Sequence, residues 1–290
     1  MSKLKPNKVY IPYYCCNSII EPLRQSGTSF KFYRINNKLE PIDFPNLEPN
    51  SIFLYINYFG LKNNFLEVLE GLYQENLWVD NTLAFYSTYN QTSEYRISFN
   101  SSRKFFGVPD GAMLRSPFPT FNSDVKHLPR NDRLISEHLK LSKVGKLEEG
   151  LTFFQSNEHH LGNGIERISK LSELMHSKIN FSGISEIRRN NFKFLHLNLN
   201  SKNMICPQIL NLSDNAVPIY YPYLPERNLP HQSLWKRKIY SPILWNDCLN
   251  RSVENFEFEK SLCQMLPLPI DQRYNQDDMD YILKIIDSVE

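Results

Sequence analysis

The sequence has no strong excess of charge of either sign, since 33 Lys and Arg residues against 31 Asp and Glu residues leave a formal net charge of +2. Sequence-independent binding of nucleic acid needs a strongly basic surface, so we expect no nucleic-acid partner. Long hydrophobic runs are also absent. No stretch is long enough and free enough of charge to span a bilayer, and residues 1–8 lack the apolar core of a signal peptide. We therefore expect a soluble, cytoplasmic protein with no membrane partner.

The few cysteines are poorly placed to form structural disulfides or to bind a metal ion. The five cysteines are an odd number, are scattered, and form no C-x-x-C pair, which argues against a disulfide framework and a structural zinc site. His159 and His160 are adjacent, and adjacent residues on a helix point in different directions. The pair therefore predicts a polar surface, and no metal is expected.

What remains is the composition of a folded protein, because 41% of the 290 residues are apolar and 22% are charged. In the first third, short runs rich in β-branched and aromatic residues alternate with helical stretches. This pattern favours an α/β fold with a mainly parallel sheet and helices on both faces. Strands are predicted over residues 8–11, 29–35, 51–59, 77–80, 95–100 and 112–115, and helices over 18–25 and 65–73.

A change of pattern divides the chain after the first third. Prolines and turn formers interrupt regular structure over residues 116–130, and residues 134–177 are mostly helical in pattern. Further strands are predicted over 194–199 and 217–221, followed by a final helix over 277–289 that Asn275 caps. We predict a large domain over residues 1–130, then connecting helices and a small α+β domain over residues 131–290.

Two ionisable residues follow predicted strands. Asp80 ends the strand over 77–80, and Lys104 comes soon after the strand that ends at Asn100. Ligands of open α/β sheets bind at the carboxyl ends of the strands. Each residue also has an ordinary explanation, because Asp-Asn is common in turns and a lysine beside Arg103 is usually solvated.

Several motifs resemble one enzyme family. The run LWVDNTLAF at 77–85, then SRK at 102–104, a five-residue spacer and DGA at 110–112 resemble the two central motifs of the DegT/DnrJ/EryC1/StrS aminotransferases. These are fold-type-I enzymes that use pyridoxal 5'-phosphate (PLP) and are best known for aminating nucleotide-linked keto-sugars. Further matches in the same order are IPYYCC at 11–16, YINYFG at 55–60, RRNNF at 188–192 and LPIDQRY at 268–274.

The resemblance implies roles for individual residues. Lys104 matches the lysine that forms the Schiff base with the cofactor, and Asp80 matches the carboxylate that pairs with the pyridinium nitrogen. A carboxylate there keeps the ring protonated, so that the ring accepts the electrons left when a substrate proton departs. Cys16 lies where many relatives place an aromatic residue over the cofactor ring, and Ser101 or Ser102 is a candidate to bind the phosphate.

The chain departs from the family pattern in two places. Relatives have a helix that binds the cofactor phosphate before the segment matched by residues 11–16, and this chain begins after that point. Position 83 is leucine, whereas relatives commonly carry a His or Gln that contacts the cofactor. Either the chain is a divergent enzyme completed by another chain, or it is a degenerate relative that keeps the fold.

The resemblance therefore implies a fold-type-I PLP-transferase-like enzyme, shortened at its N-terminus, that transfers an amino group from an amino acid to a nucleotide-linked keto-sugar in cell-surface polysaccharide synthesis. A homodimer is expected, because family members build each site from two subunits. The alternative is a non-catalytic scaffold or partner subunit. The run PIYYPY at 218–223 is either a sugar-stacking platform or, the favoured interpretation, packing between domains.

Overall fold

The computed structural model describes residues 5–89, 97–117, 125–130, 137–146, 148–150, 152–153 and 165–289. His159 and His160 lie outside the described residues, as do the first two residues of the predicted strand 95–100.

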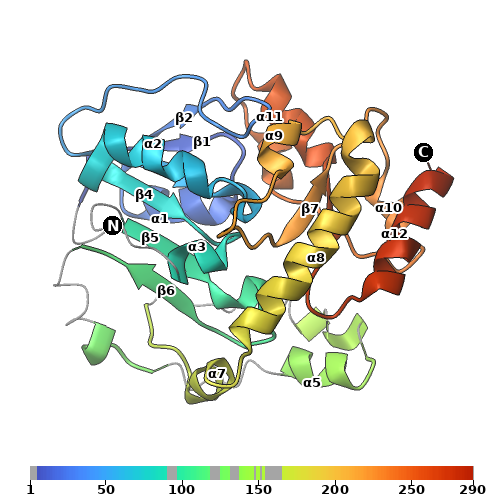
Figure 1. Ribbon diagram of the computed structural model, residues 1–290. Coiled ribbons are helices and arrows are strands. Elements are labelled where there is room, and N and C mark those ends of the chain that lie inside the picture. The colour runs from blue at the N-terminus through green and yellow to red at the C-terminus, as the bar shows by residue number, and fades with distance from the viewer. Residues whose placement is uncertain are drawn as a thin grey trace.

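A six-stranded sheet in the order β2-β1-β3-β4-β5-β6 forms the core of the first third of the chain (Figure 1). Strands β1 to β5 pair in parallel and β6 pairs antiparallel with β5, which confirms the predicted mainly parallel sheet. The strands are β1 (Lys8–Pro12), β2 (Ser29–Tyr33), β3 (Ser51–Ile56), β4 (Leu77–Asp80), β5 (Ile97–Ser101) and β6 (Ala112–Arg115).

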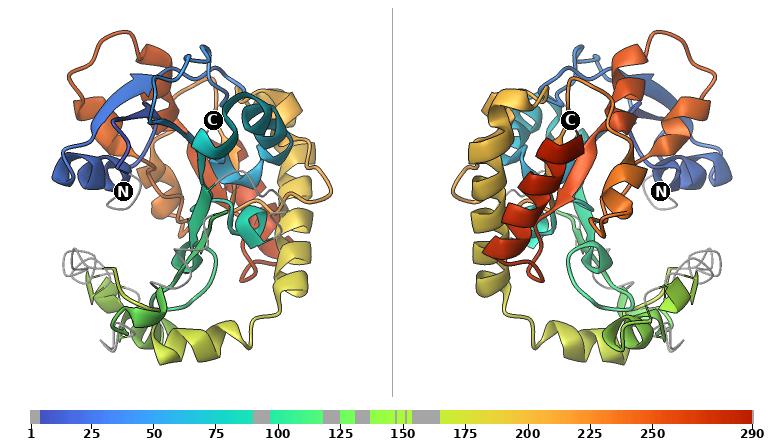
Figure 2. Two further views of the ribbon diagram at one scale, coloured as in Figure 1. Left: turned by 90° about the vertical axis from the view of Figure 1, so that its left-hand side faces the viewer. Right: turned by 90° about the vertical axis from the view of Figure 1, so that its right-hand side faces the viewer.

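Helices cover both faces of this sheet. Every residue of β3 and β4 is buried, as is usual for parallel strands between two helical layers. Helix α1 (Asn17–Gln25) connects β1 to β2, and α2 (Asn63–Tyr73) connects β3 to β4 in the opposite direction along the sheet. Right-handed crossovers in opposite directions put their helices on opposite faces, an arrangement that the side views show (Figure 2). The chain thus reverses between β1 and β3, and this switch point is where such sheets bind ligands.

The C-terminal part packs beside the sheet around one long helix. Helix α8 (Phe181–Leu199) lies against β7 (Tyr220–Tyr223) and α12 (Gln276–Val289), and β7 pairs antiparallel with β8 (Leu266–Pro269) (Figure 1). The shorter helices are α3 (Phe85–Tyr89), α5 (Glu137–Lys143), α7 (Lys170–His176), α9 (Pro207–Leu210), α10 (His231–Trp235) and α11 (Glu257–Ser261). Single 3₁₀ turns are η1 (Tyr58–Gly60), η2 (Gln74–Asn76), η3 (Ser102–Lys104), η4 (Asn200–Lys202), η5 (Asn246–Asn250) and η6 (Leu262–Gln264).

The predicted strand over 194–199 is wrong, because these residues form the last turns of α8. Phe192, Leu195 and Leu199 are buried at helical spacing, while Leu197 is 82% exposed. Asn180 starts the helix by accepting a hydrogen bond from the amide of Gly183 (3.1 Å). The short aromatic run looked strand-like only because its helical periodicity begins well upstream.

The final helix is confirmed as α12, together with its capping residue. The side chain of Asn275 accepts from the amide of Asp278 (3.2 Å), and the carboxylate of Asp278 accepts from the amide of Asn275 (2.8 Å). Met279, Ile282 and Ile286 form the buried face, as the spacing predicts.

Buried residues from both predicted domains belong to one hydrophobic cluster, and the division at residue 130 stays a prediction. Among the described residues, no helix has the length and apolar character needed to cross a membrane.

Candidate functional site

A cavity of about 360 Å³ opens at the carboxyl ends of the parallel strands. It lies at the switch point, because Cys16 follows β1 and Ile56 ends β3, and both line it. Asp80, Leu83 and Lys104 line the same cavity. Residues from two motifs that are separate in the sequence therefore share one space.

Asp80 is a buried carboxylate at the end of β4. Its side chain is 7% exposed, and one carboxylate oxygen accepts a hydrogen bond from the amide of Thr82 (2.7 Å). Burial raises the pKa of Asp80, although hydrogen bonds from Thr82 and the charge of Lys104 act in the opposite direction. A carboxylate buried in this way is costly to ionise unless a positive charge lies beside it.

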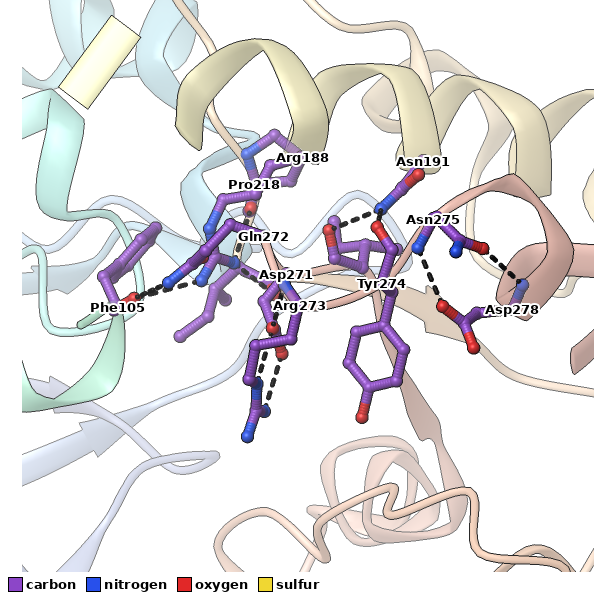
Figure 3. Close-up of polar contacts among 12 residues, drawn as sticks. Phe105, Arg188, Asn191, Pro218, Asp271, Gln272, Arg273, Tyr274, Asn275 and Asp278 are labelled. Atoms are coloured by element: carbon purple, nitrogen blue, oxygen red, sulfur yellow. Dashed lines mark hydrogen bonds and ion pairs between the residues drawn. The ribbon is translucent and has the colours of Figure 1, made fainter. Parts of the chain in front are cut away.

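Lys104 ends the 3₁₀ turn η3 that follows β5, and both ends of this turn are fixed. The amide of Ser102 donates to the carbonyl of Gly111 (3.0 Å). The carbonyl of Phe105, which follows Lys104, accepts from Arg188 Nη2 (3.3 Å) and Gln272 Nε2 (3.2 Å) (Figure 3). The exposed Lys104 side chain thus projects from a rigid backbone.

The two serine candidates differ in position. Ser101 is half-buried and lines the cavity. Ser102 is 4% exposed and is not among the residues that line it. Arg103 lies on the same wall as Ser101 and adds a positive charge there.

Cys16 immediately precedes α1, and Ser18 and Ile19 from the first turn of that helix line the cavity beside it. The loop that carries Cys16 is held from the C-terminal part of the chain. The guanidinium of Arg251 donates to the carbonyls of Tyr13 and Cys15 (2.8 Å for Cys15) and to the side chain of Asn17 (3.0 Å).

Trp245 and Leu244 complete the cavity wall and were not predicted. The indole of Trp245 packs edge-to-face on Tyr14 (ring centroids 4.6 Å apart) and Tyr58 (5.7 Å). Its backbone is left-handed (φ 52°), which is uncommon for a bulky residue and often marks a functional position. That strained conformation has no signature in the sequence, so only the structure reveals this residue.

No family model and no curated protein matches the chain. Solved structures do. A DegT DnrJ EryC1 StrS aminotransferase from Brucella abortus shares 13% identity, with 98% of this chain and 80% of that one covered and a TM-score of 0.62. The aminotransferase TlmJ from Streptoalloteichus hindustanus shares 14% identity over 99% and 80% of the two chains, with a TM-score of 0.65.

The putative sugar aminotransferase Spr1654 from Streptococcus pneumoniae, in its PMP form, is similar at 11% identity over 99% of this chain and 82% of that one, with a TM-score of 0.64. At such identities the likeness establishes the fold. The chain has the fold of the DegT/DnrJ/EryC1/StrS aminotransferases, and the resemblance seen in its motifs is confirmed at that level.

Proposed function

We propose that this protein is a PLP-dependent aminotransferase that acts on a nucleotide-linked keto-sugar with an amino acid as donor, in cell-surface polysaccharide synthesis. One observation carries the proposal. Asp80 and Lys104 come from separate motifs, and both line one cavity at the switch point of the sheet. The similar solved structures include proteins described as sugar aminotransferases, which supports the choice of substrate class.

The residues of the cavity fit this cofactor. Asp80 is a buried carboxylate that a protonated ring nitrogen would neutralise. The amine of Lys104 would hold the cofactor and then carry the proton to and from the substrate carbon. Ser101, together with Arg103, would bind the phosphate, with Ser102 behind them in the turn. The bound cofactor would supply the electron sink for the pair left on the substrate carbon.

Two residues would border the cofactor ring. Cys16 lies on one side of the cavity, at the position where relatives carry an aromatic residue. Trp245 supplies an aromatic surface from the C-terminal part, and we propose that it takes over that packing role. The same proposal includes a cytoplasmic location and a homodimer. The homodimer is proposed because the family builds each site from two subunits.

A second candidate function is a non-catalytic partner subunit with this fold. Leu83 favours it, because this residue is 5% exposed and presents an apolar side chain to the cavity where relatives commonly have a polar one. The two candidate functions differ in whether the cofactor forms a covalent bond with Lys104.

The deciding experiment adds PLP to the purified protein, records the absorbance spectrum, reduces with borohydride and maps the peptides. We expect a cofactor band and a pyridoxyl group on Lys104. The variant Lys104→Ala should lose the label, and Lys126→Ala, a change at an exposed lysine, should keep it. Label on another lysine, or none although PLP is bound, would reject the catalytic proposal and leave the partner subunit.

A further inference from the structure

Three buried cysteines from distant parts of the chain meet beside Trp245. Cys15 follows β1, Cys248 lies in η5 and Cys263 lies in η6. The carbonyl of Trp245 accepts from the amide of Cys248 (3.0 Å) and from the thiol of Cys263 (3.8 Å). The spacing of these cysteines in the sequence does not predict the cluster, because only the fold brings them together.

Cys248 and Cys263 are in direct contact within this cluster. Their turns η5 and η6 pack against each other, and the thiol of Cys263 donates a hydrogen bond to the sulfur of Cys248. A disulfide requires the two sulfurs to approach to about 2 Å. From a hydrogen-bonded contact, this is a small movement between two short turns.

A positive charge lies against Cys248. Arg251 Nη1 is 3.3 Å from the Cys248 sulfur and 3.7 Å from the Cys15 sulfur. The hydrogen bond from Cys263 lowers the pKa of Cys248, and the charge of Arg251 adds to this effect, whereas burial and the charge of Asp247 act in the opposite direction. The same hydrogen bond raises the pKa of Cys263, and burial raises the pKa of Cys15 to about 12. Cys248 therefore ionises most readily of the three, and the thiolate is the reactive form of a cysteine.

The Cys248 thiol also supports residues 13–17, which we call the Cys16 loop. The thiol donates to the carbonyl of Tyr13 (3.2 Å), and the hydroxyl of Tyr13 donates to the carbonyl of Cys248 (2.8 Å). A sulfur in a disulfide has no proton to donate, so oxidation of Cys248 removes the first of these bonds. The loop then loses one of its contacts with the C-terminal part of the chain.

We propose that Cys248 and Cys263 form a redox switch, in which hydrogen peroxide oxidises the two thiols to a disulfide and the Cys16 loop loosens. The Cys248 thiolate attacks one peroxide oxygen, which gives a sulfenic acid and releases hydroxide. The Cys263 thiol attacks the sulfenic sulfur, and the hydroxyl leaves with the Cys263 proton as water. The hydroxide takes up the proton that Cys248 lost on ionisation. Two thiols are thus oxidised to one disulfide, and one peroxide is reduced to two waters.

Burial restricts the oxidant to a small molecule. Cys248 is 0% exposed and Cys263 is 7% exposed. Hydrogen peroxide is close to water in size, whereas glutathione disulfide is a peptide that needs an open surface. Peroxide should therefore oxidise the pair, and glutathione disulfide should leave it reduced.

The first test treats the purified protein with hydrogen peroxide and maps its peptides by mass spectrometry. We expect a disulfide between Cys248 and Cys263 that dithiothreitol reverses. In Cys263→Ser the reaction should stop at the sulfenic acid, which dimedone labels on Cys248. Cys206→Ser, a change at a half-buried cysteine outside the cluster, is the matched control and should leave disulfide formation unchanged.

The rate of disulfide formation tests the role of Arg251. Arg251→Gln should slow the reaction about tenfold at neutral pH, since the thiolate loses the cation beside it. Arg251→Lys keeps a positive charge and should recover part of the rate. Thermal unfolding of both variants shows whether the fold is kept. Equal rates in the wild type and a folded Arg251→Gln would contradict the activation of Cys248 by its surroundings.

The affinity for PLP is a second readout, which rests on the proposed function. The oxidised protein should bind PLP several-fold more weakly than the reduced protein, because Cys16 lines the cofactor cavity and its loop has lost the bond from Cys248. A serine hydroxyl can still donate to Tyr13. Cys248→Ser should therefore bind PLP as the reduced wild type does, and peroxide should not change its affinity.

Absence of a disulfide at Cys248, or a disulfide from it to Cys15 or Cys16, would overturn the switch. A Cys248–Cys263 disulfide that leaves PLP affinity unchanged would overturn it as well, as would an equal peroxide effect in Cys248→Ser. The borohydride experiment separates the two proposals. The expected disulfide in a protein that binds no PLP in either redox state would remove the aminotransferase proposal and keep the oxidation site. Label on Lys104 without this disulfide would remove only the switch.

Discussion

One wall of the Lys104 cavity consists of strand ends and the turns that follow them, whereas a second wall comes from a segment far along the chain. Asp80 and Lys104 belong to the first wall, and each lies at or just after the end of a strand of the parallel sheet. Trp245 belongs to the second wall and comes from an irregular segment before η5. The first wall carries the two groups that we propose to react, and the second wall closes the cavity around them.

The two walls are also tied together. Arg188 and Gln272, both from the C-terminal part, hold the carbonyl that follows Lys104, and Arg251 holds the loop that carries Cys16. Changes in the first wall should therefore affect chemistry, and changes in the second wall should affect stability and affinity.

The largest expected effect is at Asp80. Asp80→Asn should lower the turnover of amino-group transfer about 100-fold or more, because the cofactor ring would lose its charged partner. Thermal unfolding without cofactor should show no loss of stability, since the change removes a carboxylate that is costly to bury. Undiminished turnover in Asp80→Asn would contradict the assignment of the chemistry to the first wall.

Arg188→Met should give the next largest effect, on stability. The change removes the Arg188 donor from the carbonyls of Pro218 and Ile219 in a buried region and leaves the Phe105 carbonyl with Gln272 alone, and we expect a loss of about 3 kcal/mol in the free energy of unfolding. Urea denaturation measures it, with Arg24→Met on the exposed face of α1 as the control. A loss no greater than that of the control would show that Arg188 does not connect the walls.

Asp80 and Lys104 show how much of the site can be predicted from the sequence. Each lies at or just after the end of a strand that a local apolar run predicts, so their position at the carboxyl ends of the strands follows from periodicity. The motif resemblance then assigns the two residues to one site. The strand over 194–199 was wrong because its apolar residues belong to a longer helical period. Between Ser101 and Ser102 the sequence leaves the choice open, since only the geometry of η3 decides which side chain reaches the cavity.

The second wall was not predicted because its residues have no local pattern. Trp245 has a left-handed backbone within an irregular segment, and the sequence does not show that Arg188 of α8 donates to the carbonyls of Ile219, just before β7, and Phe105, just after η3. Such contacts depend on tertiary packing between segments far apart in the chain. Of the tyrosines over residues 218–223, Tyr221 and Tyr223 are fully buried, whereas Tyr220 is half-buried and lines the cavity of about 630 Å³ that begins at Lys104, so sugar stacking by Tyr220 stays a prediction.

Trp245→Ala should have a smaller effect, on cofactor affinity. Loss of the indole removes one ring surface of the cavity, and we expect PLP to bind about tenfold more weakly. Trp245→Phe should recover part of the loss, because a ring remains against Tyr14 and Tyr58. Titration of the absorbance band measures both variants, and equal affinity in wild type and Trp245→Ala would assign the enclosing role to another residue.

The smallest expected effect is the pH dependence of stability that Asp80 causes without cofactor. Burial raises the folded-state pKa of Asp80 above its unfolded value, so the folded protein holds this proton more tightly. Ionisation of Asp80 therefore destabilises the fold as pH rises from the unfolded pKa through the folded one, and the full cost is present above the folded pKa. Asp80→Asn carries no such cost, so its stability advantage over the wild type should be largest above the folded-state pKa of Asp80 and shrink as pH falls through that window. Urea denaturation of both proteins at several pH values measures this difference. A stability advantage that stays constant with pH would mean that the Asp80 carboxylate is already paired with another group of the protein when no cofactor is bound. The cofactor would then not be needed to neutralise this carboxylate.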